Sequence, residues 1–476
     1  MEKYDVVIIG AGIGGLFCGA FLAQIGYKVA IFEKESYAGG LCSSFKNKGF
    51  VFDVAIDSIG GLKEGEFLQR VFRKLNIEKK LDLIQMQPIR RNIFPDFSID
   101  IPSDVSTYKE RLKKLFKAEE NGINGIFSFM EDFYKQSISS VLGDESVDTF
   151  KLRNLMGKSF QSLLDDYLKD RRLKGVLSSY CTSLGLPSRE VSAIAAINTL
   201  IHYVKGGACR VRGGIQKLTD LLVDLIKDHS GEVHLNEKVE KILTEKNRAT
   251  GIVTKKQRYI SSKYVISNMD LKTLINSMVL DSAMDKNRVE RLNKLEVSGS
   301  FVIAYIGTDL DLRENKLASS LGCFPSYEVD AMLNKNKNAF FGLSIPSILD
   351  NTVAPKGSYN MVAYWPLSEH KTLDKNEIAN KLTKQLDRLI PGLSRHILLQ
   401  QIADAKTLFR YTGNYNGAAY GWKQNAGFYA NLPILRNLME NFYITGHWAG
   451  LGGGVMPSAI SSLRVARQIS KEKIEI

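Results

Sequence analysis

The first 35 residues constrain the fold more than any other part of the chain. They contain the stretch DVVIIGAGIGGLFCGAFLAQIG (5–26), and no residue from Val6 to Tyr27 is charged. A run of this length suggests a membrane span or a signal peptide, but its six glycines disfavour a continuous lipid-facing helix. The lead-in Met-Glu-Lys-Tyr-Asp also lacks the positive charge of a signal peptide. We therefore expect the run to belong to a globular fold.

The pattern of this run indicates a strand, a glycine turn and a helix. Asp5–Ile9 is apolar and β-branched, which is typical of a parallel strand buried on both faces. The next six residues match G-x-G-x-x-G, in which Gly10 makes a tight turn, Gly12 lets backbone approach a pyrophosphate and Gly15 packs helix on strand. The helix should direct its N-terminus at the phosphates and end at Gly26.

A second predicted strand, Lys28–Phe32, leads into an acidic residue. This residue, Glu33, stands about 20 residues after the glycines. Its carboxylate can accept hydrogen bonds from a ribose, and its charge would repel a 2′-phosphate. Strand, turn, helix, strand and acid stand in the order that a dinucleotide site requires. The sequence therefore predicts such a site at the start of the chain.

The residues after Glu33 carry a resemblance that extends over nearly the whole chain. The run E-K-x-x-x-x-G-G at 33–40 resembles FAD-containing oxidoreductases of the glutathione-reductase type. Further segments occur in order: FDVAIDSIGG (52–61), GGACRVRGGIQKLTDLL (206–222), GEVHLNEKVEKIL (231–243), YVISNMD (264–270), FPSYEVDAM (324–332), TLFRYTGNYNGAAYGW (407–422) and YITGHWAGLGGGVMPSAISS (443–462). Together they resemble the carotenoid desaturase family of phytoene desaturases, carotenoid isomerases and retinol saturases. The segments at 407–422 and 443–456 are most similar to the isomerase and saturase branch.

The resemblance implies non-covalent FAD as the cofactor. The residues expected to hold it are Gly10, Gly12, Ile13, Gly14, Gly15, Glu33, Lys34, Gly39, Gly40, Leu41, Val239, Asn268, Gly446, His447, Gly454, Val455 and Met456. The helix expected to start near Pro457 would favour the negative charge of a reduced flavin at the turn Gly450–Met456. Leu41 departs from the Arg that flavin amine oxidases commonly carry after the Gly-Gly doublet. No cysteine in the last 150 residues could form a cysteinyl-flavin bond, and no second fingerprint for a nicotinamide nucleotide is found.

Three side chains are candidates for catalysis. His447, at the start of the glycine-rich turn, has a side chain that titrates near neutral pH and can donate or accept a proton, although a structural role is the simpler alternative. Tyr411 and Tyr420 belong to an aromatic segment that either lines a slot for a flat conjugated substrate or packs in the core.

The fold class expected is α/β, with a discontinuous Rossmann-type FAD-binding domain of the glutathione-reductase type and an inserted α+β substrate domain. The FAD-binding domain should comprise 1–75, 205–290 and 425–476, with hairpin turns near 247–248 and 257–258 and a last strand at 441–445. The substrate domain should comprise 76–204 and 291–424, and be mostly helical at 105–204. There Tyr108, Leu112, Leu115 and Phe116 are expected on one face, and Val191–Ile201 forms either a core helix or the wall of an apolar tunnel.

Composition excludes several other classes of protein. The five cysteines have no C-x-x-C spacing, and there is no H-E-x-x-H or G-x-S-x-G motif, so we expect no metal site, disulfide framework or serine hydrolase. The net charge is +13, with basic runs at 70–80, 109–117 and 169–174. No nucleic-acid-binding module accompanies them, which leaves solvated surface or attraction to an anionic bilayer. We expect a cytoplasmic protein that is peripherally associated with a membrane.

The function implied by the resemblance is FAD-dependent oxidoreduction at C=C bonds of a long apolar isoprenoid polyene, by desaturation, saturation or cis–trans isomerisation. One alternative is a flavin-dependent oxidase of an amine or an amino-acid-derived natural product, because fold does not fix substrate. Another is a non-catalytic polyene-binding protein that retains FAD. The electron partner stays open among a quinone, O2 and none.

Overall fold

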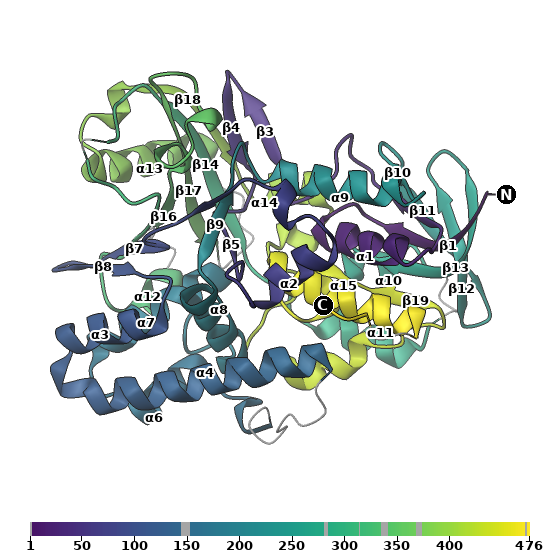
Figure 1. The fold of residues 1–476 in the computed structure, drawn as a ribbon, viewed down its shortest axis with the longest axis horizontal. Coiled ribbons are helices and arrows are strands. Elements are labelled where there is room, and N and C mark those ends of the chain that lie inside the picture. Colours follow the sequence, from purple (N-terminus) through teal and green to yellow (C-terminus); the bar gives the residue numbers. More distant parts are fainter. Residues whose placement is uncertain are drawn as a thin grey trace.

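The computed structural model describes residues 2–143, 153–279, 284–313, 315–334, 341–367, 374–471 and 474–476. Two sheets of seven strands each organise these residues, with a group of helices beside the second sheet (Figure 1). Two smaller sheets connect them, formed by β3 (Ser44–Asn47) with β4 (Phe50–Asp53), and by β5 (Ile59–Gly60), β9 (Ala208–Val211) and β6 (Leu83–Gln85). The predicted α/β fold class is confirmed.

The first sheet is built from three distant parts of the chain. Its strand order is β10 (Glu232–His234), β2 (Val29–Phe32), β1 (Glu2–Ile9), β13 (Tyr259–Ser267), β12 (Arg248–Thr254) and β11 (Val239–Glu245), and β19 (Phe442–Ile444) also pairs with β13. β2, β1, β13 and β19 run parallel, whereas β11, β12 and β13 form the expected antiparallel meander. The three-part assembly agrees with the sequence-based expectation, while the domain boundaries themselves stay a prediction.

The β-branched run predicted as a central strand occupies the middle of this sheet. Val6, Val7 and Ile8 of β1 are fully buried between β2 and β13. The following helix, α1 (Ile13–Gln24), packs against α9 (Gln216–Asp228) and α15 (Val455–Ser470). A Cβ added at Gly19 would lie 2.8 Å from Ile31 Cδ1 and 3.2 Å from Ile226 Cδ1. The run therefore contains no charge because it is the core of the first sheet.

The second sheet has the order β18 (Ile397–Ala403), β14 (Ser300–Thr308), β17 (Tyr359–Leu367), β16 (Phe341–Ser344), β15 (Ser320–Cys323), β7 (Arg90–Ile93) and β8 (Ser98–Ile101). The helices of the predicted helical part are α3 (Val105–Leu115), α4 (Glu120–Leu142), α6 (Phe160–Tyr167), α7 (Arg171–Ser178) and α8 (Ala193–Gly206). The remaining helices are α2 (Phe67–Lys74), α10 (Leu271–Ser277), α11 (Lys286–Lys294), α12 (Val329–Asn334), α13 (Lys375–Leu389) and α14 (Ala405–Thr412).

The prediction that Tyr108, Leu112, Leu115 and Phe116 share one apolar face at α3 is partly wrong. Tyr108 and Leu112 are fully buried and Phe116 is 6 % exposed, but the side chain of Leu115 is 47 % exposed. The helix ends at Leu115, and Phe116 leaves it with φ −129° and ψ 61°. That change of backbone direction buries Phe116 and leaves Leu115 in solvent.

Among the helices of the described ranges, none is both long enough and apolar enough to cross a bilayer.

Candidate active site

A cavity of about 1520 Å³ extends from the carboxyl ends of β1 and β2 to the face of the second sheet. Its lining includes Gly10 and Glu33 at one end and Leu321 and Tyr364 at the other. Pockets for one small ligand usually measure about 300–1,000 Å³. The cavity can therefore hold a dinucleotide and a second molecule together.

The structure brings nearly all of the predicted site residues to this cavity. Gly15 is the one predicted residue outside the lining, because it faces β1, where an added Cβ would collide with the carbonyl oxygen of Gly10. The lining residues among the predicted set are Gly10, Gly12, Ile13, Gly14, Glu33, Lys34, Gly39, Gly40, Leu41, Val239, Asn268, Tyr411, Tyr420, Gly446, His447, Gly454, Val455 and Met456. Their individual roles stay predictions, since contact with the cavity does not assign chemistry.

Two glycine segments lie side by side at the first end of the cavity. Gly12 and Gly39 form a parallel β-bridge, and the amide of Gly39 donates to the Ala11 carbonyl over 2.8 Å. Gly39 and Gly40 have φ of 120° and 59°, values that side chains disfavour. Backbone amides rather than side chains therefore form this wall, as a pyrophosphate site requires.

Asn268, directly after β13, and Gly446, after β19, lie against the start of α1 and form another wall of the site. A Cβ at Gly14 would lie 2.6 Å from Asn268 Oδ1 and 2.6 Å from Gly446 Cα. Ser462 of α15 donates to the Gly14 carbonyl over 2.7 Å, which fixes α15 on α1. The absence of a side chain at Gly14 thus lets α1, β13 and the turn after β19 meet.

Glu33 lies beneath the glycine turn, where its carboxylate organises the backbone. Its Oε2 accepts from the Ala11 amide over 2.8 Å, and its Oε1 accepts from the Glu35 amide over 2.9 Å. Burial raises the pKa of Glu33, although these two amides act in the opposite direction. Each oxygen retains a second lone pair, so a ribose hydroxyl can still donate to the carboxylate.

Two helices direct uncapped N-termini toward the cavity. α1 begins after Gly12 and α15 begins after Gly454, and neither start has a side-chain cap. α15 begins at Val455, two residues before the expected Pro457. Free amides and a positive helix end favour an anion, so the α1 terminus fits a diphosphate and the α15 terminus fits the charge of a reduced flavin. The residues present therefore fit FAD.

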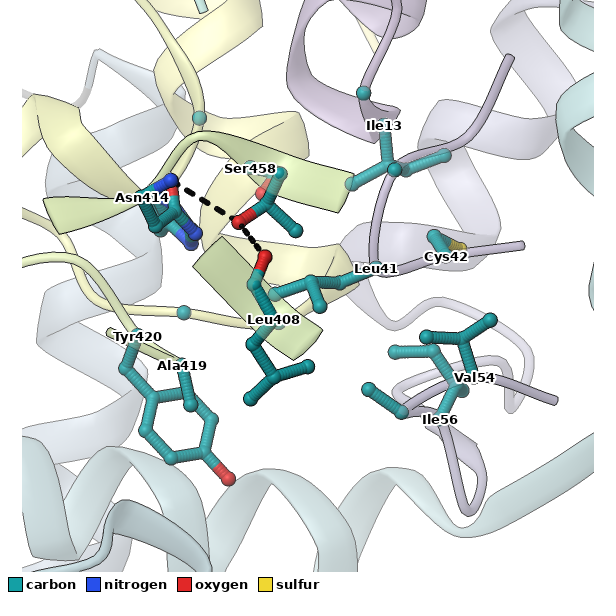
Figure 2. Close-up of a pocket in the computed structure, with 18 of the residues that line it drawn as sticks. Ile13, Leu41, Cys42, Val54, Ile56, Leu408, Asn414, Ala419, Tyr420 and Ser458 are labelled. Carbon is teal, nitrogen blue, oxygen red and sulfur yellow. Dashed lines mark hydrogen bonds between the residues drawn. The ribbon is translucent and has the colours of Figure 1, made fainter. Parts of the chain in front are cut away.

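An aromatic segment covers the glycine-rich turn. A Cβ at Gly453 would collide with the Tyr420 ring, and Figure 2 shows Tyr420, Leu41, Val54 and Ile56 around one apolar space. Burial raises the pKa of Tyr420, which keeps its hydroxyl protonated. The other predicted tyrosine, Tyr411, is 44 % exposed and stands at the rim of the cavity.

Hydrogen bonds tie this aromatic segment to the turn after β19. Trp422 donates to the Trp448 carbonyl over 3.0 Å, and Trp448 donates to Asn414 Oδ1 over 3.1 Å. The Asn414 amide donates to Thr412 Oγ1, which donates in turn to the Leu408 carbonyl, as the dashed lines of Figure 2 show. The segment is therefore held rigidly against the cavity.

His447 lines the cavity between two of these elements. A Cβ at Gly421 would lie 3.2 Å from its Cδ2, and its ring meets the Trp448 ring at a centroid distance of 5.5 Å. Burial lowers the pKa of His447 to about 4. The imidazole is therefore neutral at neutral pH, so a ring nitrogen is unprotonated, but the low pKa makes it a weaker base than an ordinary histidine.

Sequence reasoning missed Asp270 as a site residue. Asp270 caps α10, accepting from the Thr273 amide over 2.6 Å, and accepts from the Tyr415 amide over 2.8 Å. Its burial raises the pKa of its carboxyl. The signal was available, since Asp270 ends the segment YVISNMD that carried the resemblance.

Cys42 also lines the cavity, although it is only 2 % exposed. Burial raises the pKa of its thiol well above the ordinary value, so the sulfur stays protonated and a poor nucleophile. The expectation of a non-covalent cofactor therefore stands as a prediction.

Comparison with known proteins identifies the class. Residues 13–470 match the family of flavin containing amine oxidoreductases, and the chain belongs to that family. It is an FAD-dependent oxidoreductase. A putrescine oxidase of known structure is similar over 99 % of this chain and 100 % of its own, with a TM-score of 0.71 and 16 % identity, which shows the fold.

The curated relatives place the chain beside carotenoid enzymes. A 4,4'-diapophytoene desaturase (4,4'-diapolycopene-forming) from Methylomonas sp is 24 % identical over 98 % of this chain and 95 % of its own length. The chloroplastic prolycopene isomerase of Daucus carota is 23 % identical over 99 % of this chain and 80 % of its own length. The resemblance to the carotenoid desaturase family is confirmed.

Proposed function

We propose that this oxidoreductase acts on the carbon–carbon double bonds of a long apolar isoprenoid polyene. The observation that carries the proposal is the cavity, which continues from the glycine turns along apolar side chains such as Leu41, Ile56, Ile303 and Leu321. Removing hydrocarbon from water contributes about 25 cal/mol per Å² of buried area. The substrates in the names of the desaturase and the isomerase support the same class of substrate.

The residues of the chain would bind and confine the substrate while FAD supplies the two-electron redox chemistry. Tyr420 and Leu41 form apolar walls beside the glycine-rich turn, so a flat polyene can lie there with water excluded. His447 is neutral because its pKa is about 4, so a ring nitrogen is unprotonated, and as a weak base it would take a proton only from a strongly acidic group of the substrate.

A cavity-lining cation argues against the alternative of an amine oxidase. Arg90 lines the cavity and carries a guanidinium that stays charged in proteins. A cationic alkylammonium substrate would meet repulsion there, whereas an uncharged polyene would not. The family's name therefore indicates the fold and the cofactor better than it indicates the substrate.

The proposal is tested by product analysis with the purified holoprotein. Phytoene, cis- and trans-lycopene and retinol in liposomes are incubated anaerobically with oxidised or reduced flavin, and the products are separated by chromatography. We expect a polyene with altered double bonds, and a change in flavin absorbance if the reaction transfers electrons overall. Oxidation of amines with no effect on any polyene would contradict the proposal. Polyene binding without any product would favour the non-catalytic alternative.

The variant His447→Phe tests the proton-accepting role. Loss of a positioned base typically costs about 10²–10⁴-fold in rate, so we expect turnover to fall at least tenfold. The flavin absorbance of the purified variant should match that of the wild type, because Phe preserves the packing against Trp448. Full turnover in a flavin-loaded variant would show that His447 has a structural role and is not needed for catalysis.

We also propose that the protein adsorbs to anionic membranes without crossing them. The end of α3 supports this, because Lys114, Leu115 and Lys117 are all exposed and place one apolar side chain between two cations. Each Lys or Arg near anionic lipid contributes about 1 kcal/mol. The exposure of Leu115 thus fits contact with a bilayer, from which a water-insoluble substrate must come.

Flotation with anionic liposomes measures this adsorption. Binding should weaken as salt shortens the Debye length from about 10 Å at 0.1 M to about 3 Å at 1 M. The double variant Lys114→Glu/Lys117→Glu should float less than the wild type at low salt. The matched control is Lys246→Glu/Lys255→Glu, which changes two exposed lysines in the β11–β12 and β12–β13 turns. If both double variants lose the same fraction of liposome binding, the adsorption depends on net charge and not on the surface at the end of α3.

A further inference from the structure

The wall of the cavity formed by the second sheet and the helical region carries three polar side chains among apolar residues such as Leu321. Arg90 of β7, Tyr180 after α7 and Tyr364 of β17 line this region. We call these three residues the polar end. They come from three separate elements, so the fold alone brings them to one cavity.

The strand register places part of the polar end on one face of the second sheet. Gly322 of β15 pairs with Gly342 of β16, and Gly342 pairs with Tyr364 of β17, so their Cα–Cβ directions share a face. A Cβ at Gly322 would collide with Nη2 of Arg90. The guanidinium therefore lies over Gly322, with the small residue Gly342 between it and the Tyr364 ring.

Two hydroxyls of the polar end are buried without a hydrogen-bond partner among the described residues. They are the Oη atoms of Tyr180, whose residue is 5 % exposed, and of Tyr364. Burial holds the pKa of both well above the ordinary value, so both hydroxyls are donors. A buried polar group without a hydrogen bond is destabilising. A cavity that took only hydrocarbon would leave both groups unsatisfied when filled.

The charged residues around the polar end include Arg90, Asp57 and Arg210. The nearest acid, Asp57, is already engaged, because Arg210 pairs with its Oδ1 over 2.6 Å and Ser320 donates to its Oδ2 over 2.6 Å. Arg210 and Asp57 offset each other, whereas the Arg90 guanidinium lies over the Phe324 ring, 5.8 Å from its centroid, and burial lowers its pKa. Arg90 also contacts the Ser183 hydroxyl at 3.5 Å, a long and weak interaction.

We propose that the polar end binds a carboxylate at one end of the substrate, with Arg90, Tyr180 and Tyr364 as its donors. This inference rests on the proposed function and specifies it: the substrate is a long apolar polyene that carries an anionic oxygen end group. The guanidinium offers the charge and the two phenols offer hydrogen bonds, which together match the lone pairs of a carboxylate. The end group would also set which double bond lies beside Tyr420.

The test compares two probes that differ only at one end. All-trans-retinoic acid and all-trans-retinol are titrated into the holoprotein, and each Kd is read from tryptophan quenching without turnover. Hydrogen bonds to charged groups predict that the acid binds roughly 10- to 100-fold more tightly. Arg90→Gln should remove this preference and change the Kd of retinol much less than that of the acid, whereas Arg90→Lys should restore part of the preference.

Controls separate recognition from folding and from net charge. Arg388→Gln removes an exposed arginine of α13 and should preserve the preference. If Arg90→Gln does not fold, Tyr180→Phe and Tyr364→Phe delete only the hydroxyls, and each should weaken the acid more than the alcohol. Equal affinity for acid and alcohol in the wild type, or tighter binding of the alcohol, would overturn the inference. A preference for the acid without conversion of any polyene would overturn the proposed function alone.

Discussion

The variant Gly14→Ala should lose FAD, with a Kd about 100-fold above that of the wild type. The added Cβ would lie 2.6 Å from Gly446 Cα and 2.7 Å from Gly446 N, atoms of backbone that cannot rotate away. Relief requires α1 to separate from the turn after β19, and overpacking of this kind costs about 1–3 kcal/mol, occasionally more. That movement would misplace both helix N-termini that the cofactor requires.

The measurement is reconstitution of the apoprotein with FAD, followed by flavin fluorescence, with far-UV circular dichroism to check folding. The matched control is Gly427→Ala, because Gly427 is exposed and its nearest atom to an added Cβ is 3.9 Å away. A folded Gly14→Ala protein with wild-type affinity would show that close approach at Gly14 is unnecessary. If the variant does not fold, Gly12→Ala tests the same turn with less strain on the fold, since its Cβ would meet the Asn268 side chain at 2.8 Å, and it should also lose FAD because the methyl group lies where the pyrophosphate is expected.

The variant Glu33→Ala should weaken FAD binding by about ten- to a hundredfold. It removes the proposed charge-assisted bond to the ribose, and it also leaves the Ala11 and Glu35 amides without the acceptor that now holds them. Both losses act on the glycine turn that would carry the pyrophosphate. Apoprotein reconstitution gives the Kd, and an unchanged value would exclude this role for Glu33. Asp224→Ala, which removes an exposed carboxylate of α9, should have no effect.

The pH dependence provides a second measurement on Glu33. Burial raises its pKa, so the apoprotein takes up a proton there at a higher pH than an ordinary glutamate would. Only the ionised form accepts from both amides and from a ribose, so FAD affinity should fall as pH decreases through that raised pKa. Glu33→Gln should bind FAD more weakly above the raised pKa and show a smaller change with pH.

The local sequence pattern closely predicted the part of the site that would bind the nucleotide of the cofactor. The buried strand, the glycines, α1 and Glu33 lie within a few residues of their expected positions, because each is specified by neighbours in the chain. The expected strand at 441–445 is observed as β19, and the closing helix begins at Val455 instead of Pro457. Helix ends are poorly predicted, because Gly454 can end the turn as readily as Pro457 can begin a helix.

The apolar stretch Val191–Ile201 shows a limit of prediction from hydrophobic periodicity. The sequence allowed either a core helix or a cavity wall, and α8 is both. Ala196 and Ile197 are buried in the core, whereas Ala195, Asn198 and Thr199 line the cavity. Helical spacing cannot distinguish burial against protein from burial against a ligand.

The sequence by itself determined the fold class and the dinucleotide site, because those depend on spacing between residues close in the chain, while its resemblance to a known family implied FAD. Only the tertiary structure decided that Leu115 is exposed and that Arg90 and Tyr364 share a cavity with Glu33. The lowered pKa of His447 also belongs to this second group, because desolvation depends on every segment packed around the ring. Contacts between residues hundreds of positions apart leave no periodic signal in a single sequence.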